Sequence, residues 1–72
     1  MRDPRKHPVL GDVLTRFGTT REVTATLRNA RGTVTHVVYG HPTTDTPAKE
    51  TTISSWRAWA KMDAMVVREG AA

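Results

Sequence analysis

Both tryptophans of the chain lie in one short segment, residues 53–62 with the sequence ISSWRAWAKM, and this segment constrains the fold most. The chain has only one Phe and one Tyr besides, so the two indoles are the largest apolar groups available for a core. Trp56, Trp59 and Ala60 follow the i, i+3, i+4 spacing of a single helix face, and one of the two serines directly before Trp56 is the expected N-cap. A helix this short is marginal in water. We therefore expect its tryptophan face to close over a small sheet, with Trp56 the most buried residue and Trp59 nearer the rim.

Alternating apolar and polar side chains ahead of this helix predict strands. The first strand is expected over residues 9–17, with a bend at Gly11-Asp12. A connection at Gly18-Thr19-Thr20 leads to the second strand, over residues 21–28, where apolar and polar side chains alternate cleanly. One face of this strand is therefore expected to be buried and the other to face water.

Residues 29–32, with the sequence NARG, are the clearest turn signal in the chain. Asn at the first position and Gly at the fourth are typical of a type I turn that leads into a bulge, so a hairpin is predicted with a third strand over residues 33–39. Placing Arg28 opposite Thr33 sets the register. On the inner face it pairs Leu27 with Val34, Ala25 with His36, and Val23 with Val38; on the outer face it pairs Thr26 with Thr35, Thr24 with Val37, and Glu22 with Tyr39.

The rest of the sequence indicates a loop, two more strands and flexible chain termini. Residues 40–49 are polar, contain two prolines and show no apolar periodicity, so they are expected to form a mobile loop. A short strand over residues 50–53 precedes the helix, and a last strand over residues 64–68 follows it. The expected organisation is a flexible basic arm (1–8), one small domain (9–69) and a tail (70–72).

The element order and the Gly11-Asp12-Val13 opening resemble the Src-homology-3-like small β-barrel, in which a short helix lies between the fourth and fifth strands. The likeness covers residues 9–68 and implies a mainly β, five-stranded barrel. It does not imply recognition of proline-rich peptides, because the paired tyrosines and the acidic loop of the signalling domains are missing here. Together with the sequence SWRAWA at residues 55–60, the same opening is also similar to short proteins encoded in tailed-phage and prophage genomes. That likeness implies a bacterial host cell and names no activity.

Composition limits the classes of protein that fit. Seventy-two residues make one domain, and a core of this size is only marginally sufficient. The absence of cysteine excludes disulfides and thiolate metal sites and suits a reducing cytoplasm. The formal net charge of +4 favours an anionic partner, which is nucleic acid or an acidic protein surface. No apolar run reaches the length of a membrane span, and residues 1–8 lack the apolar region of a signal peptide, so we expect a cytoplasmic protein.

The candidate binding residues are basic side chains at loop ends and on the helix, together with the one tyrosine. They are Arg16, Arg21, Arg28, Arg31, Tyr39, Arg57 and Lys61. The planar guanidinium group of arginine suits phosphate or carboxylate, and Tyr39 is a ring available for base stacking.

Two hypotheses for the function follow from these residues. One is a non-enzymatic module that contacts nucleic-acid backbone with little base specificity. The other is a protein-interaction module that modulates a host protein, including an anti-defence inhibitor, or a small homo-oligomer that uses a sheet edge.

Catalysis and metal binding find little support in the sequence. His7, His36 and His41 are the only histidines, and none has the helical spacing or the accompanying acids of a zinc site. The expected register leaves His36 partly buried at the barrel rim, where a structural role is the simpler interpretation. His41 and Asp45 lie in a loop that nothing rigid positions, so they do not form an acid–base pair. We therefore expect no catalytic residue, no metal and no cofactor.

Overall fold

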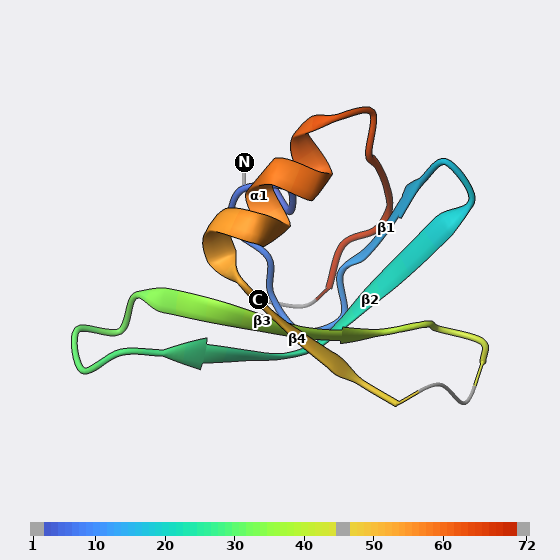
Figure 1. The fold of residues 1–72 in the computed structure, drawn as a ribbon. Helices are drawn as coiled ribbons and strands as arrows, with labels where there is room; N and C mark the ends of the chain where they lie inside the picture. The colour runs from blue at the N-terminus through green and yellow to red at the C-terminus, as the bar shows by residue number, and fades with distance from the viewer. Residues whose placement is uncertain (1–2, 45–46, 71–72) are drawn as a thin grey trace.

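The computed structural model describes residues 3–44 and 47–70, which form one antiparallel sheet and one helix (Figure 1). The elements are β1 (Val13–Arg16), β2 (Thr19–Arg28), β3 (Val34–Gly40), β4 (Lys49–Thr52), α1 (Ile53–Lys61) and β5 (Met65–Arg68). The strand order is β4-β3-β2-β1-β5, so β4 and β5 are the two edges. The predicted mainly β class, with five strands and a short helix between the fourth and fifth, is confirmed. Within the described residues the sheet is open and does not close into a barrel.

The core lies between α1 and one face of the sheet (Figure 1). Trp56, Leu14 and Val37 are completely buried, and Ala60 of α1 is buried beside them. The Trp56 ring is tilted against the ring of Trp59, with the two centroids 5.6 Å apart. Trp59 is only partly buried, so the prediction that Trp56 is the inner and Trp59 the outer indole is confirmed.

The helix begins earlier than the sequence indicates. Its N-cap is Thr52, whose side-chain oxygen accepts a hydrogen bond from the Ser55 backbone N–H at 3.1 Å. The predicted caps, Ser54 and Ser55, are both inside the helix, and Ile53 is its first residue rather than the last residue of a strand. The physical reason is packing, because Ile53 contacts the core from its helical position.

The turn of the second hairpin is confirmed, but its register is not. The Gly32 N–H donates to the Asn29 carbonyl, and the Asn29 side chain accepts from two further backbone N–H groups in the turn. Along β2 and β3 the observed partners are Leu27 with His36, Ala25 with Val38, and Val23 with Tyr39. The register shifts twice along the pair, and each shift changes which residues face each other. As a result Val37 is buried and Tyr39 packs against the core, where the opposite orientation was predicted.

The first hairpin has a two-residue turn. Arg16 pairs with Thr19, so Phe17 and Gly18 form the turn, and both have positive φ angles of 48° and 81°. Two consecutive positive φ angles are the mark of the tight turns that match the twist of paired strands. The predicted connection at residues 18–20 is therefore wrong by about two residues, and β1 is shorter than predicted at both ends.

Residues 3–8 are folded against the domain, whereas an extended arm was predicted. The backbone N–H groups of Lys6 and His7 donate to the Asp3 carbonyl, which makes a turn. Pro4 and Pro8 are buried, and the Trp56 indole N–H donates to the Pro4 carbonyl at 3.2 Å. Met1 and Arg2 lie outside the described residues. The prediction of an extended arm relied on the basic composition of residues 1–8 and overlooked the Asp3-Pro4 pair, which favours a turn.

Asp12 ties the two ends of the domain together. Its carboxylate is completely buried and accepts hydrogen bonds from the Val9 N–H at 2.8 Å and from the Gly70 N–H at 2.7 Å. The predicted tail thus begins with an anchored residue, Gly70, and its other two residues lie outside the described ones, as do residues 45 and 46 of the predicted loop. In the described parts of the chain, no helix has the length and apolar character needed to cross a membrane.

Candidate functional site

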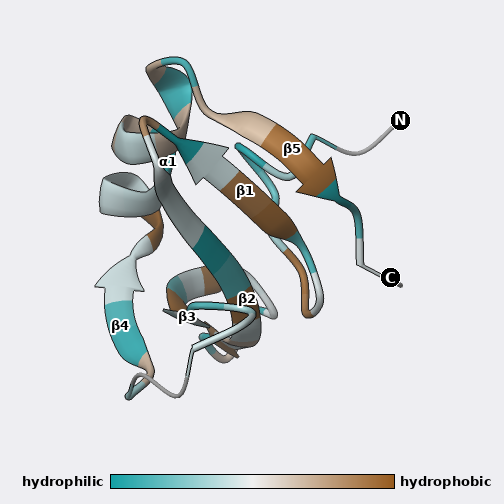
Figure 2. Cartoon of the chain, turned by 90° about the vertical axis from the view of Figure 1, so that its right-hand side faces the viewer, coloured by the Kyte–Doolittle hydropathy of each residue, from teal (hydrophilic) through white to brown (hydrophobic). Residues whose placement is uncertain are grey.

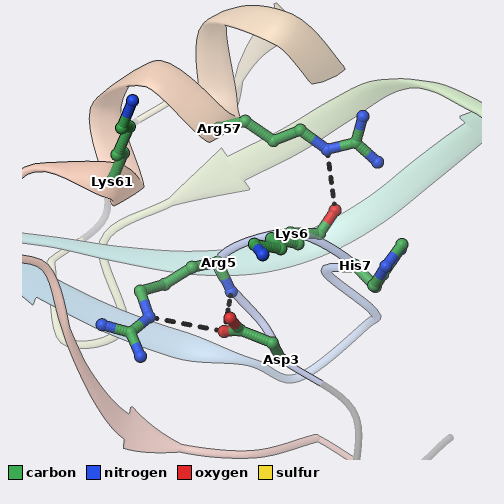
Figure 3. A pocket seen from close by; sticks show the side chains of 6 residues that line it. All are labelled: Asp3, Arg5, Lys6, His7, Arg57 and Lys61. Carbon is green, nitrogen blue, oxygen red and sulfur yellow. Dashed lines mark hydrogen bonds and ion pairs between the residues drawn. The ribbon is translucent and has the colours of Figure 1, made fainter.

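A hollow with a volume of about 700 Å³ lies between the N-terminal turn and α1 (Figure 3). It is lined by Asp3, Arg5, Lys6, His7, Arg57 and Lys61. Arg57 and Lys61 are four residues apart, so they project from the same flank of the helix. The turn at residues 3–7 supplies Arg5 and Lys6 to the same lining, which therefore holds four cationic side chains and, among the described residues, one carboxylate.

Backbone contacts hold these cations in place. The Arg57 Nε donates to the Lys6 carbonyl at 2.9 Å (Figure 3). One Arg5 side-chain nitrogen donates to the Ala64 carbonyl at 3.5 Å. The Asp3 carboxylate accepts from the Arg5 backbone N–H at 3.0 Å and from its Nε at 3.3 Å. The backbone hydrogen bond is the main reason that the pKa of Asp3 lies below its ordinary value. Because the Asp3 carboxylate is bound to Arg5, it neutralises little of the positive charge on the other cations of the hollow.

A second hollow of about 300 Å³ continues this surface toward the β2–β3 hairpin. It shares Lys6, His7 and Arg57 with the first and adds Arg28, at the end of β2. The Arg28 guanidinium donates to the Gly32 carbonyl at 2.7 Å, which holds it against the hairpin turn. Apolar side chains, among them Ile53, complete its lining. We call this continuous surface the basic groove; its cations are Arg5, Lys6, Arg28, Arg57 and Lys61.

Arg21 lies in a different environment, between two aromatic rings. Its guanidinium carbon is 4.3 Å from the centroid of the Tyr39 ring and 4.1 Å from that of Trp59, distances typical of cation–π contacts. Burial is the main cause that lowers the pKa of Arg21, and the charge of Arg16 adds to it. Within the described residues the buried Nε atoms of Arg16 and Arg21 have no hydrogen-bond partner. Arg21 therefore covers the core edge and stabilises it through its planar face.

The predicted binding residues consequently fall into separate groups. Arg28, Arg57 and Lys61 line the basic groove. Arg21 lies between Tyr39 and Trp59, and Trp59 is two residues after Arg57 and so about 200° away around the helix axis. Arg16 lies over the Phe17 ring instead, with its guanidinium carbon 5.3 Å from the ring centroid. Arg31 is exposed at the hairpin turn and lines neither hollow. Tyr39 is not a free stacking ring, because Arg21 covers it on one side and Trp56 lies against it at a centroid distance of 6.1 Å.

Two groove cations, Arg5 and Lys6, were predicted only as part of a flexible arm. The Asp3-Pro4 pair was the available signal, since it favours a turn that returns the chain to the domain. Their contact with α1 joins positions about fifty residues apart, and local patterns do not reveal such a contact.

His36 and His41 each lie close to a polar partner. His36 Nε2 lies 4.0 Å from a Glu50 carboxylate oxygen, and His41 contacts Thr43 in its own loop. Asp45, the predicted neighbour of His41, lies outside the described residues. Over residues 3–44 and 47–70, no group of three or more His, Cys, Asp or Glu side chains is arranged to hold a metal ion.

Comparison with known proteins returned no similar family or relative. No protein-family model matches the chain, and neither the curated proteins nor the solved structures contain a significant match. The functional argument therefore depends on the basic groove itself.

Proposed function

We propose that this chain is a non-enzymatic module that binds the phosphate backbone of nucleic acid in the basic groove. The supporting observation is the gathering of five cations along one continuous hollow: Arg5, Lys6, Arg28, Arg57 and Lys61. Asp3 is the single acid among the described residues that line it, and it is already paired with Arg5. Phosphate contacts of this kind position a protein on nucleic acid and carry little base specificity.

The groove chemistry favours a polyanion over a small ligand. The cations come from three separate places, the N-terminal turn, α1 and the β2–β3 hairpin, so they are spread along the groove rather than focused on one point. A chain of phosphates satisfies such a row, whereas one small anion reaches only part of it. Each neutralised phosphate releases counterions, which makes the affinity fall steeply with salt.

Fluorescence anisotropy with labelled single-stranded DNA, duplex DNA and RNA tests the proposal. We expect binding at low salt and a linear fall of log affinity with log salt concentration. A slope of roughly −4 corresponds to about four or five phosphate contacts. Affinity that is undetectable at low salt, or that does not depend on salt, contradicts nucleic-acid binding.

A pair of lysine substitutions separates the groove from overall charge. Lys61→Gln removes a groove cation, and Lys49→Gln removes the same charge from the exposed β4 edge, outside both hollows. Lys61→Gln is expected to weaken binding and to reduce the magnitude of the salt slope by about 1, whereas Lys49→Gln changes little. Equal losses in the two variants contradict a role for the groove.

The Src-homology-3-like architecture remains part of the proposal for the fold. The position of α1 between β4 and β5 matches the element order on which that resemblance depends. Backbone contacts between β4 and β5 in solution, measured by NMR, support a closed barrel, and a sheet whose β4 and β5 edges stay apart contradicts it. A phage or prophage origin is proposed from the sequence likeness alone.

A further inference from the structure

Exposed apolar side chains gather along one edge of the sheet, at β5. Seven large apolar residues of the described chain are strongly exposed, and six of them lie in β5 or close to its ends; these six are Leu10, Phe17, Met62, Met65, Val66 and Val67. Thr15 pairs with Met65, which places Phe17 beside the start of β5, and the Leu10 carbonyl lies against Gly70, just beyond its end. We call these six residues the apolar stripe. Figure 2 shows β5 as the outermost strand beside β1, with apolar colouring over most of β5 and over the start of β1.

The two edges of the sheet differ in character. The β4 edge has the sequence KETT, and charged or polar residues of this kind discourage pairing with another chain. The β5 edge has the sequence MVVR, and all four residues are exposed. Its one charged residue, Arg68, is bound to the Glu22 carboxylate at 2.8 Å. The β5 edge therefore lacks the charged protection that β4 has.

Phe17 is an unusual choice for its position. Its φ of 48° is in the left-handed region, where Asn or Gly is favoured and a bulky side chain is strained. The ring is nevertheless 77% exposed, so burial within this chain does not compensate the strain. The guanidinium carbon of Arg16 lies 5.3 Å from the ring centroid, and most of the ring stays open to a contact with another chain.

We propose that the apolar stripe is the interface of a homodimer in which two copies of β5 lie side by side and antiparallel. The six residues together expose on the order of 600 Å² per chain, compared with roughly 800 Å² per partner in an interface of standard size. This is the most that the contact can bury, because Val66 points to the opposite face of the sheet from Met65. The area is at the lower end of the range for specific complexes, so the dimer is expected to be concentration-dependent. Val67 has no partner in β1, because the register of the β1–β5 pair shifts there. Since β5 is irregular at this point, we expect side-chain packing to contribute more to the stability of the dimer than a long hydrogen-bond ladder between the two β5 strands.

Symmetry and charge favour a second copy of this chain, joined through its own β5, as the partner of the β5 edge. Joining β5 to the β4 edge of another copy is head-to-tail and open-ended, and it sets an apolar strand against KETT. Joining β5 to β5 closes the assembly at two copies and sets apolar residues against apolar residues. The antiparallel arrangement also brings Asp63, just before the strand, toward Arg68 of the partner subunit at its end.

Sedimentation equilibrium on nucleic-acid-free protein over a wide concentration range tests the proposal. The mass is expected to rise from one chain to two and then to stop. Met65→Lys and Val67→Lys place like charges near the two-fold axis and are expected to raise the dissociation constant by about tenfold or more. Leu27→Lys is the matched control, because Leu27 is the one exposed large apolar residue outside the stripe among the residues that the structure describes.

Phe17→Asn distinguishes loss of the interface from loss of the fold. Asn suits the left-handed conformation better than Phe, so the melting temperature at concentrations where the protein is monomeric is expected to stay the same or to rise. The same change removes the largest exposed ring and is expected to weaken the dimer. A single-chain mass at the highest concentration, an assembly that grows beyond two chains, or an equal effect of Leu27→Lys overturns the proposal.

Discussion

At the scale of single residues, Trp56 connects the core to the start of the chain. Its ring is completely buried, and its N–H donates to the carbonyl of Pro4, fifty-two positions earlier. A buried donor needs such a partner, because leaving it unsatisfied costs about 1–3 kcal/mol. The indole therefore contributes through its volume to the core and through its nitrogen to the N-terminal turn.

Substitution of Trp56 separates these two contributions. Trp56→Ala is expected to lower the free energy of unfolding by about 3–5 kcal/mol, mainly by leaving a cavity. Trp56→Phe keeps most of the apolar volume but leaves the Pro4 carbonyl without its donor, so a smaller loss of about 1–3 kcal/mol is expected. Chemical denaturation measures both. An unchanged midpoint for Trp56→Ala contradicts the central role of this residue in the core.

At the scale of elements, the junction between β4 and α1 is a single residue. Thr52 is the last residue of the strand and also the N-cap of the helix, with extended angles of −70° and 156°. Its side-chain oxygen accepts the Ser55 N–H, and its hydroxyl is within 3.0 Å of the Ser55 hydroxyl. No loop separates the two elements, so the cap fixes the direction in which α1 crosses the sheet.

Thr52→Val tests this junction, since it retains the branched shape of the side chain and removes only the capping oxygen. We expect the free energy of unfolding to fall by about 0.5–2 kcal/mol. Ser54→Ala is the control, because Ser54 is exposed inside the helix, where Ala is a better helix former. Thermal melting compares the two. A larger loss for Ser54→Ala than for Thr52→Val supports the cap that the sequence predicted and contradicts the observed one.

The elements also show where sequence reasoning succeeds. Asn29 and Gly32 identify the second hairpin because turn chemistry is local. The register of that hairpin was missed because two irregularities shift the pairing, and local alternation does not show where a strand bulges. Two of the five cations of the basic groove, Arg5 and Lys6, were missed for a related reason. Arg57 and Lys61 are on a recognisable helix flank, whereas Arg5 joins them only through packing against a distant part of the chain.

At the scale of the whole molecule, stability and the proposed binding surface share the N-terminal turn. The turn supplies Arg5 and Lys6 to the basic groove, and it also gives Trp56 its acceptor and buries Pro4. Asp12 similarly joins the two ends of the domain by binding the N–H groups of Val9 and Gly70. In a chain of seventy-two residues with a small core, such end-to-end contacts carry a large share of the stability.

Two variants separate these roles of the turn. Replacing residues 1–7 by an initiating Met removes the acceptor of the Trp56 N–H, so the free energy of unfolding is expected to fall by at least about 1–3 kcal/mol, and nucleic-acid binding should weaken as well. The double variant Arg5→Gln, Lys6→Gln keeps the turn, because the backbone donors and acceptors of its hydrogen bonds remain. It should therefore weaken binding while nearly preserving stability. If the truncated protein unfolds at the same denaturant concentration as the intact chain, the turn contributes nothing to the fold. If in addition the double variant binds normally, the N-terminal cations are not part of the binding surface, and Arg28, Arg57 and Lys61 alone must account for any binding.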